Sequence, residues 1–221
     1  MQASIIVFPG TNRERDAAMT LERVSGKKPH LVWHQETDLP QSDLIVIPGG
    51  FSYGDYLRTG AMAAHSPIMR SVIERAQKGV RVLGICNGFQ ILCETQLLPG
   101  VLLRNAHLKF NCKFVTLKVE NAATDFTRKY KAGEQFSCPV AHGDGNYFAD
   151  GDTLKQLEDQ QQVAFRYVDN PNGSAANIAG IFNTAKNVLG LMPHPENASE
   201  DLHGVTAGSK LFESIVASMA A

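Results

Sequence analysis

Residues 80–90 read Val80-Arg81-Val82-Leu83-Gly84-Ile85-Cys86-Asn87-Gly88-Phe89-Gln90, an apolar run that leads into a cysteine with a glycine two residues before it and two after it. The following stretch, 89–97, is apolar enough to form a helix. The G-x-C-x-G spacing is the cysteine form of the nucleophile elbow, a strained strand-to-helix turn at the carboxyl edge of a parallel sheet. A Cβ at either glycine would crowd that turn, and the start of a helix favours thiolate over thiol. The alternative is a buried structural cysteine.

Short apolar runs predict further strands in the first half of the chain. They do not alternate strictly with polar residues, which indicates burial on both faces as in a parallel sheet. The runs cover 4–8, 30–33, 44–47 and 80–85, and helix-length segments lie between them at 16–24 and 67–79, the second with Ser66 as N-cap. This alternation predicts a doubly wound sheet, so we expect the loops after Phe8, Ile47 and Ile85 to share one ligand-binding rim.

The second half has a different pattern. Residues 108–119 alternate apolar and polar side chains, as a strand with one solvated face does, and 163–168 and 178–182 look similar. We interpret these as an antiparallel extension of the same sheet. Residues 188–192 return to the buried type, and 209–219 are expected to form a closing amphipathic helix. The predicted fold class is therefore α/β, a doubly wound, mainly parallel sheet flanked by helices with an antiparallel extension, in one domain over residues 1–221.

A candidate base follows the last buried run. The stretch 188–192 leads into Pro193-His194-Pro195-Glu196, which places His194 on the same rim as Cys86 if the two strands are parallel. An extended His-Pro-Glu segment would let the Glu196 carboxylate hydrogen-bond the imidazole, giving a nucleophile, a base and a group that fixes the tautomer of the base. The alternatives are a loop histidine that caps a strand and a solvated carboxylate.

Consecutive glycines, Gly49 and Gly50, follow the run 44–47 on the same rim. Glycines permit the backbone to turn its N–H groups toward a ligand. Together with the amide of Asn87, the residue after the candidate nucleophile, a glycine amide here would hold a tetrahedral oxyanion. The alternative is an ordinary tight turn.

Composition narrows the class of protein. The chain has 221 residues with 21 basic and 22 acidic side chains, a formal net charge of −1, and no long run of either sign, which argues against binding to nucleic acid or to an anionic membrane. Its four cysteines have neither zinc-site nor disulfide spacing, so we expect no metal site and a reducing, cytoplasmic location. We find no signal peptide and no segment long enough to span a bilayer.

Taken together, these segments resemble the class I (triad) glutamine amidotransferase family over nearly the full length of the chain. The C-x-G-x-Q and H-P-E combination is specific for that class, while the F-S-Y-G-D and A-H-G-D-G segments resemble its branch of glutaminase subunits of phosphoribosylformylglycinamidine synthase, an enzyme of purine biosynthesis. The matching segments are F-P-G-T-N at 8–12, P-G-G-F-S-Y-G-D-Y-L-R at 48–58, G-I-C-N-G-F-Q-I-L at 84–92, L-K-F at 108–110, P-V-A-H-G-D-G-N at 139–146 and G-L-M-P-H-P-E at 190–196.

The resemblance implies a flavodoxin-like amidotransferase fold and glutamine as the substrate. Cys86 would attack the glutamine side-chain amide to give a γ-glutamyl thioester and ammonia, His194 would shuttle the protons, and Glu196 would orient His194. The amides of Gly50 and Asn87 would form the oxyanion hole. The remaining substrate-binding positions implied by the resemblance are Gly49, Gln90, His142 and Gly143. Departures from the usual residues of the family, which concern the partner-facing surface and the ammonia exit, are Arg13, Thr59, Asp144 and Asn197.

The chain has no G-x-x-x-x-G-K-[ST] loop, no clustered arginines and no G-x-G-x-x-G after a strand. Nothing in it indicates ATP binding, so no cofactor is expected in this chain, and ATP and Mg²⁺ would belong to a synthetase partner. The resemblance implies a large synthetase subunit, which uses the ammonia to convert formylglycinamide ribonucleotide to formylglycinamidine ribonucleotide, and a small bridging subunit.

Three other functions stay open at this point. The chain resembles, more weakly, the glutaminase of another biosynthetic complex or a γ-glutamyl hydrolase, which would share the triad but not the F-S-Y-G-D and A-H-G-D-G segments. A non-catalytic flavodoxin-like regulatory module would keep Cys86 only as a redox-sensitive thiol.

Overall fold

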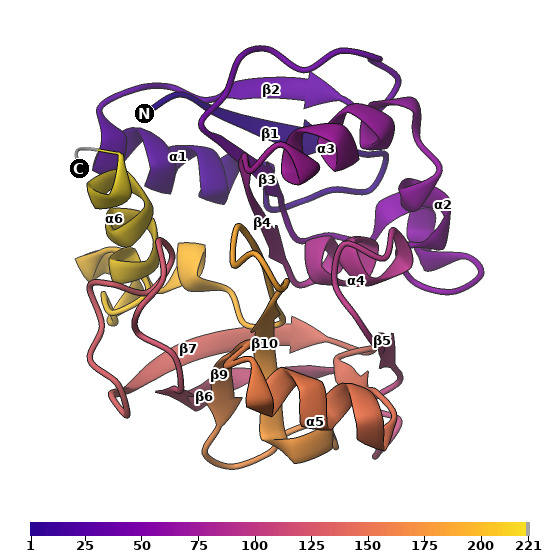
Figure 1. Cartoon of the computed structure of the whole chain (residues 1–221), viewed down its shortest axis with the longest axis vertical. Helices are drawn as coiled ribbons and strands as arrows, with labels where there is room; N and C mark the ends of the chain where they lie inside the picture. The colour runs from indigo at the N-terminus through magenta and orange to yellow at the C-terminus, as the bar shows by residue number, and fades with distance from the viewer. Residues whose placement is uncertain (220–221) are drawn as a thin grey trace.

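The computed structural model describes residues 1–219, whose strands form one nine-stranded mixed sheet and a separate two-stranded sheet. The order in the large sheet is β2-β1-β3-β4-β11-β10-β9-β6-β7. The first five strands pair in parallel, and from β11 onward every neighbouring pair is antiparallel. Figure 1 shows α6 beside α1, and α5 at the opposite end of the molecule. The prediction of a single domain also includes residues 220–221, which lie outside the described residues.

The elements have the following bounds. The strands are β1 (Ala3–Val7), β2 (His30–Trp33), β3 (Leu44–Ile47), β4 (Arg81–Ile85), β5 (Val101–Leu103), β6 (Asn111–Val119), β7 (Gln135–His142), β8 (Asn146–Phe148), β9 (Val163–Tyr167), β10 (Ile178–Phe182) and β11 (Val188–Leu191). The α-helices are α1 (Glu14–Ser25), α2 (Ala61–Ala64), α3 (Pro67–Gln77), α4 (Asn87–Glu94), α5 (Gly151–Asp159) and α6 (Ser209–Ser218). The 3-10 turns are η1 (Ser52–Asp55), η2 (Ala175–Asn177), η3 (Pro195–Asn197) and η4 (Asp201–His203).

The predicted fold class is confirmed. Each strand predicted in the first half is present with ends within one residue, and β1, β3, β4 and β11 run in parallel, so the loops after them do share one rim. The antiparallel extension is also present and contains β10, β9, β6 and β7. Helices lie on both sides of the parallel strands. The helix α1 contacts β1 and α6, whereas α4 contacts β4 and β11, and Figure 1 shows α1 and α6 on one side of β3 and β4 and α3 and α4 on the other.

Several elements differ from the sequence-based expectation. The helix α4 begins at Asn87 and ends at Glu94, rather than covering 89–97, and β6 begins only at Asn111. Ser66 does occupy the N-cap position of α3, but its side chain makes no capping bond, because its hydroxyl lies 2.9 Å from that of Tyr53. The sequence patterns do not predict the strands β5, β7 and β8 or the helices α2 and α5.

The helix α4 lies directly on the sheet because two facing glycines have no side chains. Gly84 of β4 pairs with Gly190 of β11. A Cβ at Gly84 would lie 2.7 Å from the carbonyl oxygen of Gly88, and one at Gly190 would lie 2.2 Å from the Phe89 ring. Gly88 is just as crowded, since its Cβ would come within 1.9 Å of the Ile47 carbonyl oxygen. The two glycines that flank Cys86 are therefore required by close packing, as the sequence predicted.

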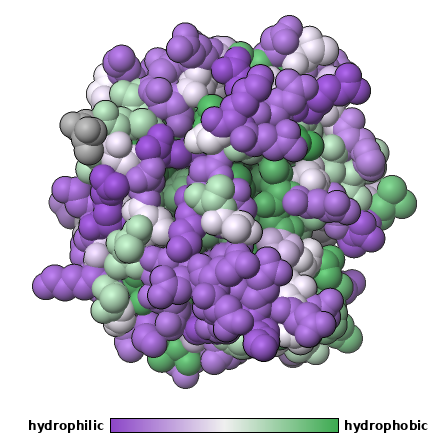
Figure 2. Space-filling model, in the orientation of Figure 1, coloured by the Kyte–Doolittle hydropathy of each residue, from purple (hydrophilic) through white to green (hydrophobic). Residues whose placement is uncertain are grey.

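The face drawn in Figure 2 is mainly hydrophilic, and its hydrophobic residues gather in a hollow between its upper and lower halves. None of the helices in the described part of the chain is both long and apolar enough to cross a bilayer.

The first prediction concerns the crowding at Gly88. We expect Gly88→Ala to lower the free energy of unfolding by about 1–3 kcal/mol, because overpacked sites must shift the backbone. Gly151→Ala is the matched control, since no atom lies within 4 Å of its Cβ position and its φ is not positive, and we expect it to change stability by less than about 0.5 kcal/mol. Denaturant melts of the two variants measure the difference, and equal stability would contradict the packing argument.

Candidate active site

Cys86 occupies a strained turn between β4 and α4. Its backbone angles are φ 51° and ψ −104°, a region that residues with a Cβ rarely adopt and that costs about 1–3 kcal/mol. The turn is held because the Cys86 N–H donates to the Leu191 carbonyl at 2.8 Å, while the Cys86 carbonyl accepts from the Phe89 and Gln90 amides at 3.0 and 3.2 Å. The thiol lies 3.7 Å from the Ala141 carbonyl oxygen. The strained, glycine-flanked geometry is that of a nucleophile elbow.

His194 and Glu196 form a buried pair on the same rim. The imidazole Nδ1 lies 2.6 Å from Glu196 Oε1, and both side chains are almost fully buried. The expected contact is thus present, but the expected extended segment is not: residues 195–197 form the 3-10 turn η3, which curls the carboxylate back toward the ring. The His194 N–H donates to the Pro139 carbonyl at 2.8 Å, which ties this turn to β7.

The charges around His194 favour its protonated form. Burial alone lowers the pKa of the imidazole, but the Glu196 carboxylate and the Cys86 sulfur together outweigh burial and raise the pKa of His194 to about 10. Nε2 is buried and makes no hydrogen bond to any described residue. With Nδ1 engaged by Glu196, Nε2 is the nitrogen left to exchange a proton with Cys86.

Two backbone amides near Cys86 are unpaired. Neither the Gly50 N–H nor the Asn87 N–H donates to another described residue, and Asn87 is the first residue of α4, where helix geometry leaves the N–H free. Gly49 packs against the imidazole ring, because a Cβ on it would lie 2.7 Å from His194 Cε1. A side chain at Gly49 would displace the base.

A cavity of about 210 Å³ opens beside the sulfur, smaller than the ~300–1,000 Å³ typical of drug-sized ligands and suited to a single amino acid. Of the nine site residues predicted from the sequence, five line this cavity, and Gly49, Asn87, His194 and Glu196 lie outside its lining. The lining residues are Gly50, Phe51, Asp55, Cys86, Gln90, Arg104, Phe110, Ala141, His142, Gly143 and Asp144.

Gln90 and His142 are held by protein groups. The Gln90 amide donates to the Asp144 carbonyl at 2.7 Å and accepts from the Asn87 side chain at 2.9 Å, so it connects α4 to the loop after β7. His142 Nδ1 lies 3.0 Å from Asn105 Oδ1 while Nε2 is buried without a partner. Burial, followed by the charge of His194, lowers the pKa of His142 to about 4, so His142 is neutral at pH 7.

The cavity contains three charged residues that sequence analysis did not assign to substrate binding, although it singled out Asp144 as a departure from the family's usual residue. Asp55, Arg104 and Asp144 form no ion pair or side-chain hydrogen bond with any described residue. Burial, followed by the nearby charge of Asp144, raises the pKa of Asp55 to about 6. Asp55 and Asp144 lie inside the F-S-Y-G-D and A-H-G-D-G segments, which was an available signal, but nothing local marks Arg104.

The other cysteines lack this environment. Cys93 lines a larger cavity of about 780 Å³ between the end of α4 and α5, but burial raises the pKa of its thiol. Burial also raises the pKa of Cys138, and Cys112 is exposed. Within residues 1–219, no group of three or more His, Cys, Asp or Glu side chains is arranged to hold a metal ion.

Comparisons with known proteins identify the family and the fold. Residues 1–210 match the CobB/CobQ-like glutamine amidotransferase domain. The chain is 59% identical over 218 residues to the phosphoribosylformylglycinamidine synthase subunit PurQ of Chelativorans sp., covering 98% of each chain. It is 57% identical to the PurQ subunit of Zymomonas mobilis, with both chains covered completely. Among solved structures, PurLQS from Thermotoga maritima contains a chain that superposes with a TM-score of 0.91 at 45% identity, covering 99% of this chain and 98% of that one.

The second prediction concerns the charge on His194. Because Glu196 raises the pKa of His194, we expect Glu196→Gln to lower that pKa toward the ordinary value, about 6.5. In the wild type, the contribution of the charged His194 ring to the free energy of unfolding is fully present below about pH 6.5 and is lost as the pH rises through about 10. The variant should lose it at a lower pH.

An NMR titration of the His194 ring measures this pKa directly. Glu74→Gln, which removes an exposed carboxylate on α3, is the matched control and should leave the titration unchanged. An unchanged His194 pKa in Glu196→Gln would contradict the charge argument.

Proposed function

The chain belongs to the CobB/CobQ-like glutamine amidotransferase family, in its branch of PurQ subunits of phosphoribosylformylglycinamidine synthase, and we propose that Cys86, His194 and Glu196 are the residues with which it hydrolyses glutamine. The observation that supports this assignment best is the combination of a strained cysteine, a histidine–carboxylate pair and an amino-acid-sized cavity at one rim of the sheet. It is the glutaminase subunit of that synthase.

In the proposed mechanism, the Cys86 thiolate adds to the side-chain carbonyl carbon of glutamine and forms a tetrahedral intermediate. The carbon–nitrogen bond then breaks, ammonia leaves with a proton from His194 Nε2, and a γ-glutamyl thioester remains. Water attacks the thioester while His194 accepts its proton, which releases glutamate and restores the thiolate and the protonated His194. Glu196 holds Nδ1, so that Nε2 carries out both proton transfers.

The Gly50 and Asn87 amides are proposed to stabilise the tetrahedral oxyanion. Both N–H groups are unpaired, and Gly50 lines the cavity that contains the Cys86 sulfur. Preorganised backbone donors of this kind contribute about 2.7–4 kcal/mol each to transition-state stabilisation.

The charged residues of the cavity are proposed to recognise the amino-acid end of glutamine. Glutamine carries an α-ammonium and an α-carboxylate at neutral pH, and the cavity holds unpaired charges of both signs. Asp55, with Asp144 beside it, suits the ammonium, whose binding would relieve the repulsion that raises the pKa of Asp55. Arg104 suits the carboxylate. Gln90 and His142 shape this end of the cavity, since their side chains are held by other protein groups. Gly143 belongs to the loop that follows His142.

The ammonia is proposed to pass to a partner. The structural relative from Thermotoga maritima is the complex PurLQS, and by that likeness we propose a large synthetase subunit and a small bridging subunit as partners of this chain. ATP and Mg²⁺ would then bind the synthetase. We further propose that the chain acts in the cytoplasm, because four cysteines without disulfides suit a reducing compartment.

The third prediction tests the nucleophile. Cys86→Ala is expected to abolish glutamine-dependent synthesis by the reconstituted complex while synthesis from free ammonia continues, because the synthetase reaction does not need the thiol. Cys93→Ala is the matched control and should keep both activities. Loss of the ammonia-dependent activity in Cys86→Ala, or glutamine-dependent synthesis that survives, would contradict the assignment. Equal glutaminase rates with and without the synthetase partner would favour a stand-alone hydrolase.

The fourth prediction tests recognition of the amino-acid end. Asp55→Asn and Arg104→Gln should each raise the KM for glutamine about 10–100-fold, the effect of losing one hydrogen bond to a charged group. Asp55→Asn should lose the preference for glutamine over glutaramic acid, which lacks the α-amino group. Arg104→Gln should instead lose the preference over 4-aminobutanamide, which lacks the α-carboxylate.

The KM of the wild type should also rise as the pH falls through about 6, since Asp55 is then protonated. Asp152→Asn, an exposed carboxylate at the start of α5, is the matched control. Equal effects of the Asp55 and Arg104 variants on all three substrates would contradict these roles.

A further inference from the structure

The Glu196 carboxylate is held by a single protein group. Oε1 contacts His194 Nδ1 at 2.6 Å, while Oε2 is buried and accepts no hydrogen bond from any described residue. A buried carboxylate usually gains several donors. Here the side chain has no second donor to fix it, so the position of the carboxylate depends on where the backbone of η3 lies.

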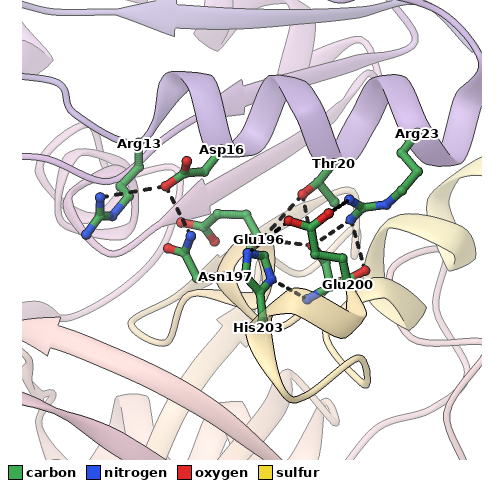
Figure 3. Close-up of polar contacts among 9 residues, drawn as sticks. Arg13, Asp16, Thr20, Arg23, Glu196, Asn197, Glu200 and His203 are labelled. Carbon is green, nitrogen blue, oxygen red and sulfur yellow. Dashed lines mark hydrogen bonds and ion pairs between the residues drawn. The ribbon is translucent and has the colours of Figure 1, made fainter.

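Two buried hydroxyl groups hold that backbone. The Glu196 carbonyl oxygen accepts a hydrogen bond from Ser199 Oγ at 2.8 Å and a longer one from Thr20 Oγ1 at 3.4 Å. The two hydroxyl oxygens lie 3.0 Å apart. Thr20 and Ser199 are 2% and 5% exposed, and hydrogen bonds in such a setting are stronger than at the surface. Figure 3 shows Thr20 reaching from α1 to the loop that carries Glu196.

Arg23 also contacts the Ser199 hydroxyl. One terminal nitrogen of its guanidinium donates to Ser199 Oγ at 2.8 Å and to the Ser199 carbonyl at 2.9 Å, and the other terminal nitrogen pairs with Glu200 at 2.7 Å. Because Ser199 Oγ accepts from arginine, its own proton is left for the Glu196 carbonyl at 2.8 Å or for the Thr20 hydroxyl at 3.0 Å. The shorter contact favours the bond to the Glu196 carbonyl, which holds η3.

The contacts that α1 makes with this loop come from one face of the helix. Asp16, Thr20 and Arg23 are spaced by four and three residues, which places them on the same side of a helix. Asp16 Oδ2 accepts from the Asn197 side chain at 3.0 Å, so the loop after His194 is held at three successive turns (Figure 3). On its other side α1 is anchored in the core by the buried Ala17 and Leu21.

We propose that Thr20 and Ser199 are positioning residues of the Cys86–His194–Glu196 triad, an inference that rests on the function proposed above. They contact neither the cavity nor the sulfur, and they act by fixing the Glu196 backbone so that its carboxylate stays against Nδ1. The other titratable or charged groups near this pair are Cys86 from the β4–α4 turn, Cys138 and His142 from β7, Arg13 before α1 and His203 of η4. Neither hydroxyl contacts any of them, although His203 Nδ1 accepts from the Ser199 backbone N–H at 3.3 Å.

The fifth prediction is that Thr20→Val and Ser199→Ala each lower kcat for glutamine hydrolysis about tenfold, a loss of 1.4 kcal/mol of transition-state stabilisation. The KM should change less than twofold, because the charged residues of the cavity belong to other elements. Thr20→Ser keeps the hydroxyl and should restore kcat. The alkaline limb of the pH profile of kcat, which reports loss of the His194 proton needed by the leaving ammonia, should also shift to lower pH in Thr20→Val, because a looser Glu196 raises the His194 pKa less.

A control separates this role from general destabilisation. Thr127 lies in the loop between β6 and β7, away from the site. It is fully buried, and its hydroxyl oxygen lies 2.7 Å from that of Thr124. Thr127→Val should lower the melting temperature as Thr20→Val does, with unchanged kcat and pH profile. If Thr127→Val reproduced the kinetic loss, or if both Thr20→Val and Ser199→Ala kept the wild-type kcat and profile, the proposal would be overturned.

A double-mutant cycle identifies the residue through which Thr20 acts. Glu196→Gln should retain measurable activity, since the cysteine–histidine pair remains. In that background Thr20→Val should change kcat less than twofold. The same tenfold loss in both backgrounds would show that Thr20 acts elsewhere and would overturn the inference. Failure of the proposed function would give a different result from failure of this inference. The wild type would then neither hydrolyse glutamine nor be alkylated at Cys86 by a glutamine-analogue electrophile.

Discussion

The close approach of α4 to the sheet is the constraint on which the rest of the site depends. Gly84 and Gly190 face each other across β4 and β11, and a side chain at either position would push the helix outward. With α4 seated, the chain must turn sharply at Cys86, which explains why a residue with a Cβ accepts an unfavourable conformation there. The same pairing of β4 with β11 directs His194 to the rim where the sulfur emerges.

The two halves of the sheet contribute different parts of the chemistry. The parallel half carries Cys86 and His194, the proposed nucleophile and base, and the antiparallel half supplies the wall of the cavity through Ala141 and His142 at the end of β7. The two histidines near Cys86 also differ in charge. The pKa of His142 is lowered and that of His194 is raised by their respective surroundings, so two histidines near one thiol serve different purposes.

The sequence predicted what local patterns encode and missed what arises from contacts between distant segments. The elbow, the buried strands and the glycine pair are each readable within about ten residues. The strand β7 has the expected alternation of buried residues, but Pro139 argues against a strand unless the strand lies at an edge, and only the assembled sheet shows that β7 is the last in the order. No pattern in the residues around Arg104 or Thr20 indicates a role for them, because their roles depend on contacts with loops and turns that are distant in the sequence.

The pairing of β4 with β11 also separates the parts of the catalytic machinery in time. His194 follows Cys86 by 108 residues (194 − 86), so at the usual pace of ~5–20 residues per second the base leaves the ribosome roughly 5–20 s after the nucleophile. Throughout that interval the growing chain has a thiol but no partner to activate it. On the proposed roles, a nascent chain that carries Cys86 without His194 would not hydrolyse glutamine.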